Sequence, residues 1–322
     1  MRKLIVLGLL ASLALAALFA IPAGARPPST NGQIVLGRFD FTVFATFIYT
    51  VNPDGSDEHQ VLPFTLECPH WSSDGTRIVT CGLPDGSSAV IINPDTGSFR
   101  EVFSSDPTLF LACFLPSPDG QRLACELAGE PADSSRDGIY SIRSSDGGGL
   151  TRITSNPGGH DNPGDYSPEG RRFVFGRSDQ NGDPVGLFVV NVNGTGLKQI
   201  TPTGTLLSST GNWSPRGNEI IFSRHLTGDV HSTLWVVHSD GSGLHQIQVQ
   251  GVACGGADDD PNGIGCFGPH WSPDGTKILF GISSAEGNDD YTINADGSGL
   301  TQVTHDGDVE DVGDWGSHPL AG

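Results

Sequence analysis

Basic residues are scarce in this 322-residue sequence, which contains 17 Lys and Arg against 37 Asp and Glu. The formal net charge is therefore −20. A surface with this excess of acid repels nucleic acid and anionic lipid, and it suits cations or a basic partner. The same charge is also what a protein that stays soluble outside the cell can carry. The net charge therefore argues against a nucleic-acid partner, but it does not identify any other partner.

Catalytic signatures are also missing from the sequence. Hydrolases of the α/β type expose their nucleophile in a Gly-x-Ser-x-Gly turn, and that motif does not occur. Nor does the chain contain a P-loop or a glycine-rich dinucleotide fingerprint. Two formal N-glycosylation sequons begin at Asn193 and Asn212, and we interpret both as turn and strand residues. None of these motifs indicates nucleophilic or nucleotide-dependent catalysis.

Long apolar runs are confined to the start of the chain. Two basic residues precede an apolar segment, residues 4–21, and the small residues Ala-Gly-Ala follow it and end at Ala25. This order is typical of a secretory signal peptide. An uncleaved anchor is the alternative, because the run approaches the ~18 residues of a membrane span. We predict a signal peptide over 1–25, a single domain over 26–322, and a periplasmic or extracellular location.

What the sequence does contain is a recurring hairpin motif. The segment His270–Gly281 enters a Ser-Pro-Asp-Gly turn from one apolar stretch and leaves it as Ile-Leu-Phe. Proline presets φ and glycine permits positive φ, so apolar residues on both sides predict a β-hairpin. The motif occurs five times, at spacings of 45, 50, 47 and 58 residues. Its turns are centred on Asp74, Asp119, Glu169, Arg216 and Asp274.

A second hairpin follows each copy of the first. Its turn usually carries Asp-Gly or Asn-Gly, and the returning strands read alike, as in 197–201 and 300–304. Two hairpins per repeat give four antiparallel strands. Four strands with a period of ~40–50 residues are typical of a β-propeller blade. Six second hairpins therefore predict an all-β, six-bladed propeller.

The remaining first hairpin is split between the two ends of the chain. Residues 31–36 match its outgoing half, and Asp314-Trp315-Gly316 match its incoming half. We predict that the C-terminal segment is the innermost strand of the blade that the N-terminal segment begins. This arrangement closes the ring and removes two open sheet edges.

The repeat resembles that of a known family. Trp-Ser-Pro-Asp-Gly followed by an Asp-Gly-Ser-Gly-Leu turn is similar to the WD-repeat-like propeller repeat of TolB. The resemblance covers about residues 31–316. It implies a periplasmic or extracellular scaffold that contacts peptides or envelope proteins. The shared fold alone does not determine the function.

Six cysteines in an exported chain predict three disulfides. Two pairs straddle equivalent turns in neighbouring repeats, where residues equally far from the turn face each other across a hairpin. The third pair closes the longest loop between blades. The expected pairs are Cys68–Cys81, Cys113–Cys125 and Cys254–Cys266.

Candidate binding residues lie just before the tryptophan position of the innermost strand, beside the central channel. Five of the six blades carry a polar residue there. Two histidines and one carboxylate fall on consecutive blades, and this set could bind a metal ion. Polar groups that simply line a wet channel are the commoner outcome. The candidates are His70, Asp165, Asn212, His270 and Asp314.

Acidic residues gather in the loops at the other face of the propeller. One of these loops contains Asp-Asp-Asp-Pro-Asn-Gly, which matches the opening of a calcium-binding loop. Hard oxygen ligands without histidine suit Ca²⁺. We therefore predict a weak calcium site at Asp258, Asp260 and Asn262, to which the neighbouring acidic loop, 306–311, could add a carboxylate. A solvated acidic rim is the alternative interpretation.

Together these features favour an exported, non-catalytic β-propeller that binds a protein, peptide or envelope ligand. Varied loops on a rigid scaffold are a common place for binding, so we expect contact through the loop face or the channel. The alternative is a metal-dependent polysaccharide lyase or hydrolase of propeller fold, with the metal held by His70 and His270. Neither a nucleic-acid partner nor a transmembrane segment is expected after signal cleavage.

Overall fold

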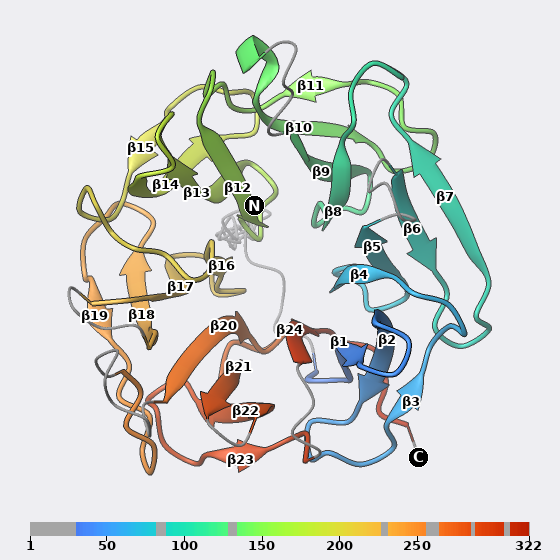
Figure 1. The fold of residues 1–322 in the computed structure, drawn as a ribbon, viewed down its shortest axis with the longest axis vertical. Coiled ribbons are helices and arrows are strands. Elements are labelled where there is room, and N and C mark those ends of the chain that lie inside the picture. Colours follow the sequence, from blue (N-terminus) through green and yellow to red (C-terminus); the bar gives the residue numbers. More distant parts are fainter. Residues whose placement is uncertain are drawn as a thin grey trace, which may run out of the picture.

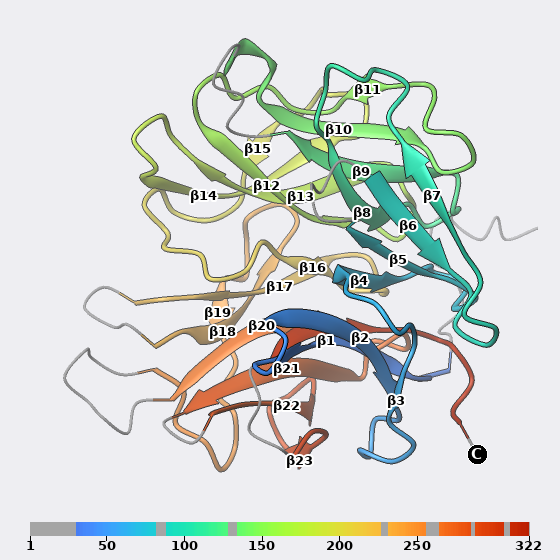
Figure 2. The same ribbon diagram turned by 45° about the vertical axis from the view of Figure 1, so that its right-hand side comes forward.

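Six four-stranded antiparallel sheets form a ring, and the described residues contain almost no helix. The computed structural model describes residues 30–81, 88–127, 134–226, 231–255, 264–284, 287–305 and 310–321. Figures 1 and 2 show the sheets arranged radially around a central axis, with one strand of each sheet nearest that axis. The predicted all-β, six-bladed propeller is confirmed.

The first three blades are described here from the channel outward. Blade 1 consists of β24 (Glu310–Trp315), β1 (Ile34–Asp40), β2 (Ala45–Val51) and β3 (His59–Gln60). Blade 2 consists of β4 (Glu67–Trp71), β5 (Ile78–Cys81), β6 (Ser88–Ile92) and β7 (Phe99–Phe103). Blade 3 consists of β8 (Ala112–Pro116), β9 (Arg122–Leu127), β10 (Gly138–Arg143) and β11 (Thr151–Arg152), with the short 3₁₀ helix η1 (Ser134–Arg136) before β10.

The last three blades follow the same order. Blade 4 consists of β12 (His160–Tyr166), β13 (Arg172–Ser178), β14 (Pro184–Asn191) and β15 (Lys198–Gln199). Blade 5 consists of β16 (Asn212–Trp213), β17 (Glu219–Arg224), β18 (Thr233–His238) and β19 (His245–Gln246). Blade 6 consists of β20 (Gly265–Trp271), β21 (Lys277–Ser284), β22 (Gly287–Asn294) and β23 (Thr301–Gln302).

The Ser-Pro-Asp-Gly motif forms the turn between the two inner strands, as predicted. In blade 6 the Asp274 carboxylate accepts hydrogen bonds from the Ser272 hydroxyl at 2.8 Å and from the backbone N–H of Thr276 at 2.9 Å. Gly275 follows with a φ of 67°, in the left-handed region that glycine occupies without strain. The motif thus holds its own turn through side-chain hydrogen bonds, which explains why it recurs from blade to blade.

The ring closes through the two ends of the chain. Strand β24 pairs antiparallel with β1, with Ile34 opposite Trp315 and Val35 opposite Asp314. The Trp315 indole N–H also donates to the Gly32 carbonyl at 2.9 Å. The predicted closure is confirmed, and the innermost strand of blade 1 comes from the end of the chain.

The core lies between blades rather than within any one of them. The buried apolar residues fall into six clusters, and each cluster joins two neighbouring blades. Between blades 3 and 4, for example, Leu115 and Ile139 pack with Phe173 and Phe188. A single blade has too little apolar surface to fold alone, so the stability of each blade depends on its neighbours.

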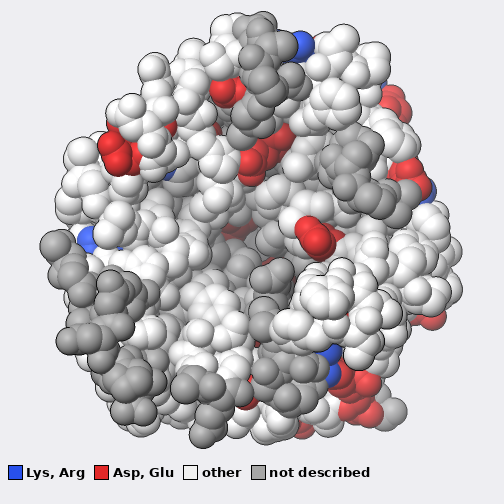
Figure 3. Space-filling model, in the orientation of Figure 1, with Lys and Arg blue, Asp and Glu red and all other residues white. Residues whose placement is uncertain are grey.

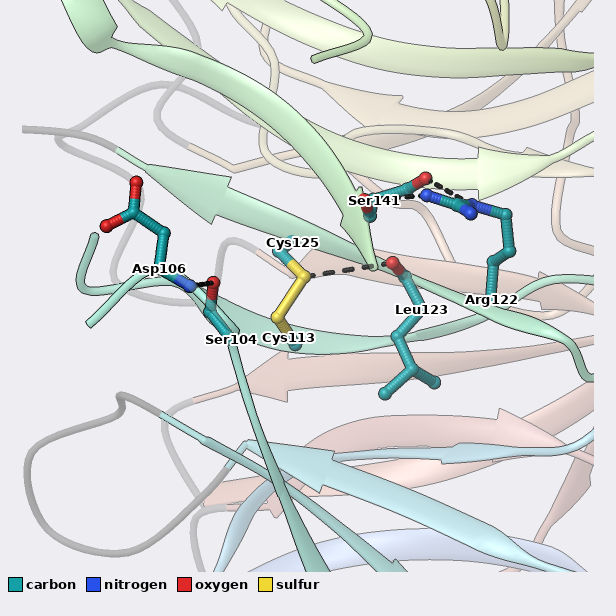
Figure 4. The surroundings of a disulfide bond; sticks show 7 residues. All are labelled: Ser104, Asp106, Cys113, Arg122, Leu123, Cys125 and Ser141. Carbon is teal, nitrogen blue, oxygen red and sulfur yellow. Dashed lines mark hydrogen bonds between the residues drawn. A yellow bond between two sulfur atoms is a disulfide. The ribbon is translucent and has the colours of Figure 1, made fainter. Parts of the chain in front are cut away.

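The three predicted disulfides are confirmed. Cys113 lies opposite Cys125 on β8 and β9, with Cα atoms 3.9 Å apart, and Figure 4 shows this bridge between the two strands. The Cα–Cα distance is 5.5 Å in both other pairs, Cys68–Cys81 and Cys254–Cys266. Pairing of β4 with β5 and of β8 with β9 each includes a register shift next to the bridged cysteine. Three disulfides indicate an oxidising compartment.

Within the part of the chain that the structure describes, no helix is long and apolar enough to cross a membrane.

Candidate functional site

A cavity of about 630 Å³ occupies the channel at the end where the Ser-Pro-Asp-Gly turns lie. Its walls combine flat aromatic rings and prolines with polar side chains from the turns and the innermost strands. The aromatic and proline residues are Trp71, Pro116, Pro118, Tyr166, Pro168, Trp213, Pro215, Trp271, Pro273 and Trp315. A mostly apolar cavity of this size with a few fixed polar groups is the usual form of a ligand-binding site.

The structure brings the sequence-predicted binding residues together around this channel. Four of the five line the cavity, namely His70, Asp165, Asn212 and Asp314. His270 lies beside them, with its Nδ1 atom 3.6 Å from the Asp314 carboxylate. Figure 3 shows the opposite face of the ring, that of the varied loops, where the centre is also hollowed and acidic side chains are more frequent than basic ones.

The polar residues before the tryptophan position hold neighbouring blades together. The Asp314 carboxylate accepts a hydrogen bond from the backbone N–H of Trp71 in the next blade, at 3.0 Å. The Asp165 carboxylate accepts one from the backbone N–H of Trp213 at 2.9 Å. It also accepts one from the Asn212 side-chain amide at 3.1 Å. These side chains are therefore structural links as well as candidate binding groups.

Blades 5 and 6 are joined in the same way. The Asn212 side-chain oxygen accepts a hydrogen bond from the backbone N–H of Trp271 at 2.8 Å. Blade 3 departs from the pattern, because it carries Leu115 before Pro116 at the equivalent positions. Leucine has no acceptor, and proline has no backbone N–H to donate. Sequence reasoning found the polar positions but missed their backbone partners, which lie 48 to 243 residues away in the chain.

Two histidines flank the Asp314 carboxylate. The Nδ1 atom of His70 lies 3.9 Å from it, and the His70 ring also stacks on Phe114 with centroids 5.8 Å apart. Burial lowers the pKa of His70 to about 4, although the charge of Asp314 opposes this shift. For Asp314 burial alone would raise the pKa, but the nearby imidazoles of His270 and His70 and the hydrogen bond from the Trp71 backbone N–H outweigh it and lower the pKa. At neutral pH this side of the channel holds an ionised carboxylate and a neutral His70.

Asp165 lies on the opposite side of the channel and behaves differently. Burial raises its pKa to about 7, although the hydrogen bond from the Trp213 backbone N–H favours the charged form. Among the described residues no cation forms an ion pair with this carboxylate, and the more distant His270 only weakly opposes the effect of burial. Asp165 therefore changes its charge near neutral pH, and a cationic ligand group in the cavity would favour its ionised state.

Across the residues described by the structure, no group of three or more His, Cys, Asp or Glu side chains is placed to hold a metal ion. The ring centroids of His70 and His270 are 6.1 Å apart, with Asp314 between the two rings. The expected calcium residues Asp258, Asp260 and Asn262 lie outside the described residues, and so does the neighbouring segment 306–309. The calcium site stays a prediction.

Of the two expected places for binding, the loop face and the channel, the cavities described here include one in the channel. Both the channel cavity and a smaller one between blades 3 and 4 are lined by residues of the repeated turns. The turns bring proline and aromatic side chains around the channel, and these rigid groups leave space between them.

Comparison with known proteins agrees with this architecture. The sequence profile of the TolB beta propeller domain matches residues 47–262. The chain belongs to the TolB β-propeller family. None of the curated proteins matches its sequence.

Solved structures of TolB proteins resemble the fold. TolB from Acinetobacter baumannii superposes with a TM-score of 0.67 at 16% identity, over 88% of this chain and 66% of that one. A putative TolB from Agrobacterium tumefaciens gives 0.61 at 19% identity, over 85% and 89%. The tricorn protease gives 0.54 at 16% identity, over 85% of this chain and 26% of that one. The chain thus spans slightly less than two thirds of the Acinetobacter protein, and at these identities the likeness shows the fold alone.

Proposed function

We propose that this chain is an exported, non-catalytic propeller that binds a protein or peptide ligand in its channel. The signal-peptide pattern over 1–25 and the three disulfides support export into an oxidising compartment. If residues 26–322 form a single domain, as we propose, the propeller itself binds the ligand. Membership in the TolB family supports a scaffold role but does not name the ligand.

The channel cavity is the observation that carries this proposal. Its volume of about 630 Å³ and its tryptophan-rich wall suit the side chains of an inserted peptide segment. Tryptophan and tyrosine are enriched where proteins bind other proteins, because they bury a large rigid surface at a low entropic cost. Asp165, Asn212, His70 and Asp314 would supply the polar contacts that orient the segment, and His270 would hold Asp314 in place.

A rim substitution that narrows the cavity tests the proposal. Ser73 is an exposed turn residue that lines the cavity, whereas Gln121 is an exposed turn residue that does not. We expect the mature chain and Gln121→Trp to capture the same proteins from a cell-envelope extract, and Ser73→Trp to capture at least tenfold less of them. Quantitative mass spectrometry of the captured proteins measures this. Equal capture by all three chains would exclude the channel as the binding site.

A second experiment distinguishes the proposed non-catalytic binding protein from the alternative, a metalloenzyme. The double variant His70→Ala/His270→Ala removes one proposed polar contact and the support of Asp314. It should therefore capture the same proteins more weakly, with no change in metal content, if the channel only binds them. Elemental analysis of the purified mature chain accompanies this test. A stoichiometric transition metal that is lost in the double variant would contradict the non-catalytic proposal.

A further inference from the structure

Three blades carry an arginine at the same place, near the end of the second strand that lies toward the varied loops. These strands are β1, β13 and β17 of blades 1, 4 and 5 (Figure 1). Their common starting points are Gln33, Arg172 and Glu219, whose carbonyls accept a hydrogen bond from the backbone N–H of the residue after the tryptophan position. Five residues further along the chain lie the equivalent arginines, which are Arg38, Arg177 and Arg224.

Each of these guanidinium groups lies over an aromatic ring of the third strand. The ring residues are equivalent as well, because each pairs with the residue two positions before the arginine. A cation is attracted to the face of an aromatic ring, so the ring helps to fix where the guanidinium lies. The distances from the guanidinium carbon to the ring centroid are 5.1 Å for Arg38 over Tyr49, 5.2 Å for Arg177 over Phe188, and 3.7 Å for Arg224 over Trp235.

In blades 1 and 4 a carboxylate binds the stacked guanidinium. The Nη2 atom of Arg38 donates to a Glu58 oxygen at 2.7 Å. Arg177 binds Asp161 through two contacts, from Nε at 2.6 Å and from Nη2 at 2.7 Å. Asp161 belongs to the inner strand, whereas Glu58 precedes the outer strand. The planar guanidinium has N–H donors that match a carboxylate, and the chain thus satisfies this group from either side.

Blade 5 has the arginine and the ring, but leucine replaces both acids. Leu207 lies opposite Arg224, at the place that Asp161 takes in blade 4. Leu244 takes the place of Glu58, counted from the outer-strand residue that pairs with each ring. Both leucines pack against the core cluster between blades 4 and 5. Apolar side chains therefore stand at the two positions from which the other blades supply a carboxylate.

The Arg224 guanidinium is partly buried and has no acidic partner among the described residues. Its Nε atom is enclosed and makes no hydrogen bond, whereas its terminal amino groups are not enclosed and can reach a ligand. Burial lowers the pKa of Arg224, and no carboxylate in the described ranges opposes this shift. A partly buried cation without a partner costs free energy, which a bound anion would offset.

We propose that the loop end of the cleft between blades 4 and 5 binds a carboxylate of another polypeptide at Arg224. The carboxylate accepts hydrogen bonds from the terminal amino groups, as Asp161 does from Arg177, and Trp235 holds the guanidinium in place. The apolar wall of Leu207, Trp235 and Leu244 favours an apolar side chain beside the carboxylate. The residues of this site do not line the channel cavity, and its test needs no partner protein.

Capped amino acids serve as probes of the mature chain. N-acetyl-leucine has a free terminal carboxylate, N-acetyl-glutamate α-amide has a side-chain carboxylate, and N-acetyl-leucine amide has neither. At constant ionic strength we expect both acids to shift the NMR signals of the Arg224 Nε–H and the Trp235 indole N–H at millimolar concentration. The neutral probe should bind at least tenfold more weakly. The acid that saturates at the lower concentration identifies the preferred kind of carboxylate.

Three results with these probes would overturn the proposal. The first is equal binding of the neutral probe, and the second is the absence of a shift with either acid up to about 100 mM. The third is tighter binding of inorganic phosphate than of either acid, because the site would then select a different anion.

Substitutions of the arginine provide the second arm. Arg224→Met keeps a long side chain against Trp235 but removes the charge, so the acids should no longer shift the indole signal. Arg224→Lys keeps the charge but lacks the planar fork, and it should bind the acids at least tenfold more weakly. Unchanged binding by either folded variant would contradict the site.

Leu207 offers a matched pair of variants. Leu207→Asp places a carboxylate opposite Arg224, as in blade 4, and Leu207→Asn has the same shape without the charge. Both lose the packing of leucine, so their difference isolates the carboxylate. We expect Leu207→Asp to melt at the higher temperature and to exclude the acid probes, whereas Leu207→Asn should still bind them. Equal melting temperatures and equal binding would contradict the proposal, and if either variant fails to fold, the Arg224 variants decide the question.

Discussion

At the scale of single residues, two side chains in the channel have pKa values that differ from their ordinary values for the same reason. Burial penalises the charged form, so it raises the pKa of the Asp165 carboxyl to about 7 and lowers the pKa of the His70 imidazole to about 4. The stability that Asp165 contributes is present below its ordinary pKa of 3.8 and is lost as the pH rises through 7. His70 acts in the opposite direction: its contribution is present above 6.5 and is lost as the pH falls through 4.

Replacement of Asp165 by asparagine should therefore change the pH dependence of stability. The amide oxygen of Asp165→Asn can still accept the Trp213 N–H, but the side chain no longer ionises. We expect the variant to be more stable than the parent at pH 8, by about 2–4 kcal/mol, and nearly equal to it at pH 4. Urea unfolding at both pH values measures this.

Asp314→Asn is the matched control, because the pKa of Asp314 is lowered and its charge contacts two histidines. A lowered carboxyl pKa contributes stability above its ordinary value, so this variant should be less stable than the parent at pH 8. If Asp165→Asn changed stability equally at pH 4 and pH 8, burial of its charge would not be the cause.

At the scale of elements, the disulfides fasten strands that already pair. Cys113 and Cys125 join the two inner strands of blade 3 and lie in the cluster between blades 2 and 3. Closure of a loop of this size is worth about 3 kcal/mol in chain entropy. We expect Cys113→Ala/Cys125→Ala to lose about 2–4 kcal/mol of unfolding free energy in urea titrations, with part of the loss coming from packing.

Peptide mapping without reduction provides the covalent check. The parent chain should release the three local pairs, and the double variant should retain the other two. A peptide that joins Cys68 to Cys113 would contradict the pairing, because these residues belong to different blades.

At the scale of the whole molecule, stability depends on closure of the ring. Strand β24 contributes Trp315 to the cluster between blades 6 and 1, and Asp314 to the hydrogen bond with the next blade. Removal of residues 311–322 should therefore lower the melting temperature by more than 10 °C, since it opens two sheet edges and exposes a core cluster. Scanning calorimetry measures the change.

A shorter deletion, residues 317–322, is the control. It removes the His318 ring, which stacks on Trp71 with centroids 4.9 Å apart, but keeps β24, so we expect a loss of only about 1–2 kcal/mol. An unchanged melting temperature after the longer deletion would mean that the ring does not need its inner C-terminal strand.

The sequence alone determined the six blades, the split blade and the disulfide pairs. Each of these features follows from a local sequence pattern: Ser-Pro-Asp-Gly turns with apolar flanks, a regular repeat length, and cysteines placed about one hairpin apart. Their geometry depends on hydrogen bonds between near neighbours, such as Asp274 with Thr276, and short-range chemistry can be read from adjacent residues. For this reason the position of Trp315 beside Ile34 could be predicted although 281 residues separate them.

Only the tertiary structure decided what the channel residues contact and where space remains. The bond from the Trp71 N–H to Asp314 crosses between blades, and no local pattern encodes such a partner. Cavities likewise depend on how side chains from two blades fill a shared cleft: Arg172 covers Trp213, whereas the equivalent Arg122 donates to Ser141, and a cavity remains beside it. Repeats fix the backbone, but the balance of packing and hydrogen bonding at each interface sets the rotamers, and that balance exists only once the blades meet.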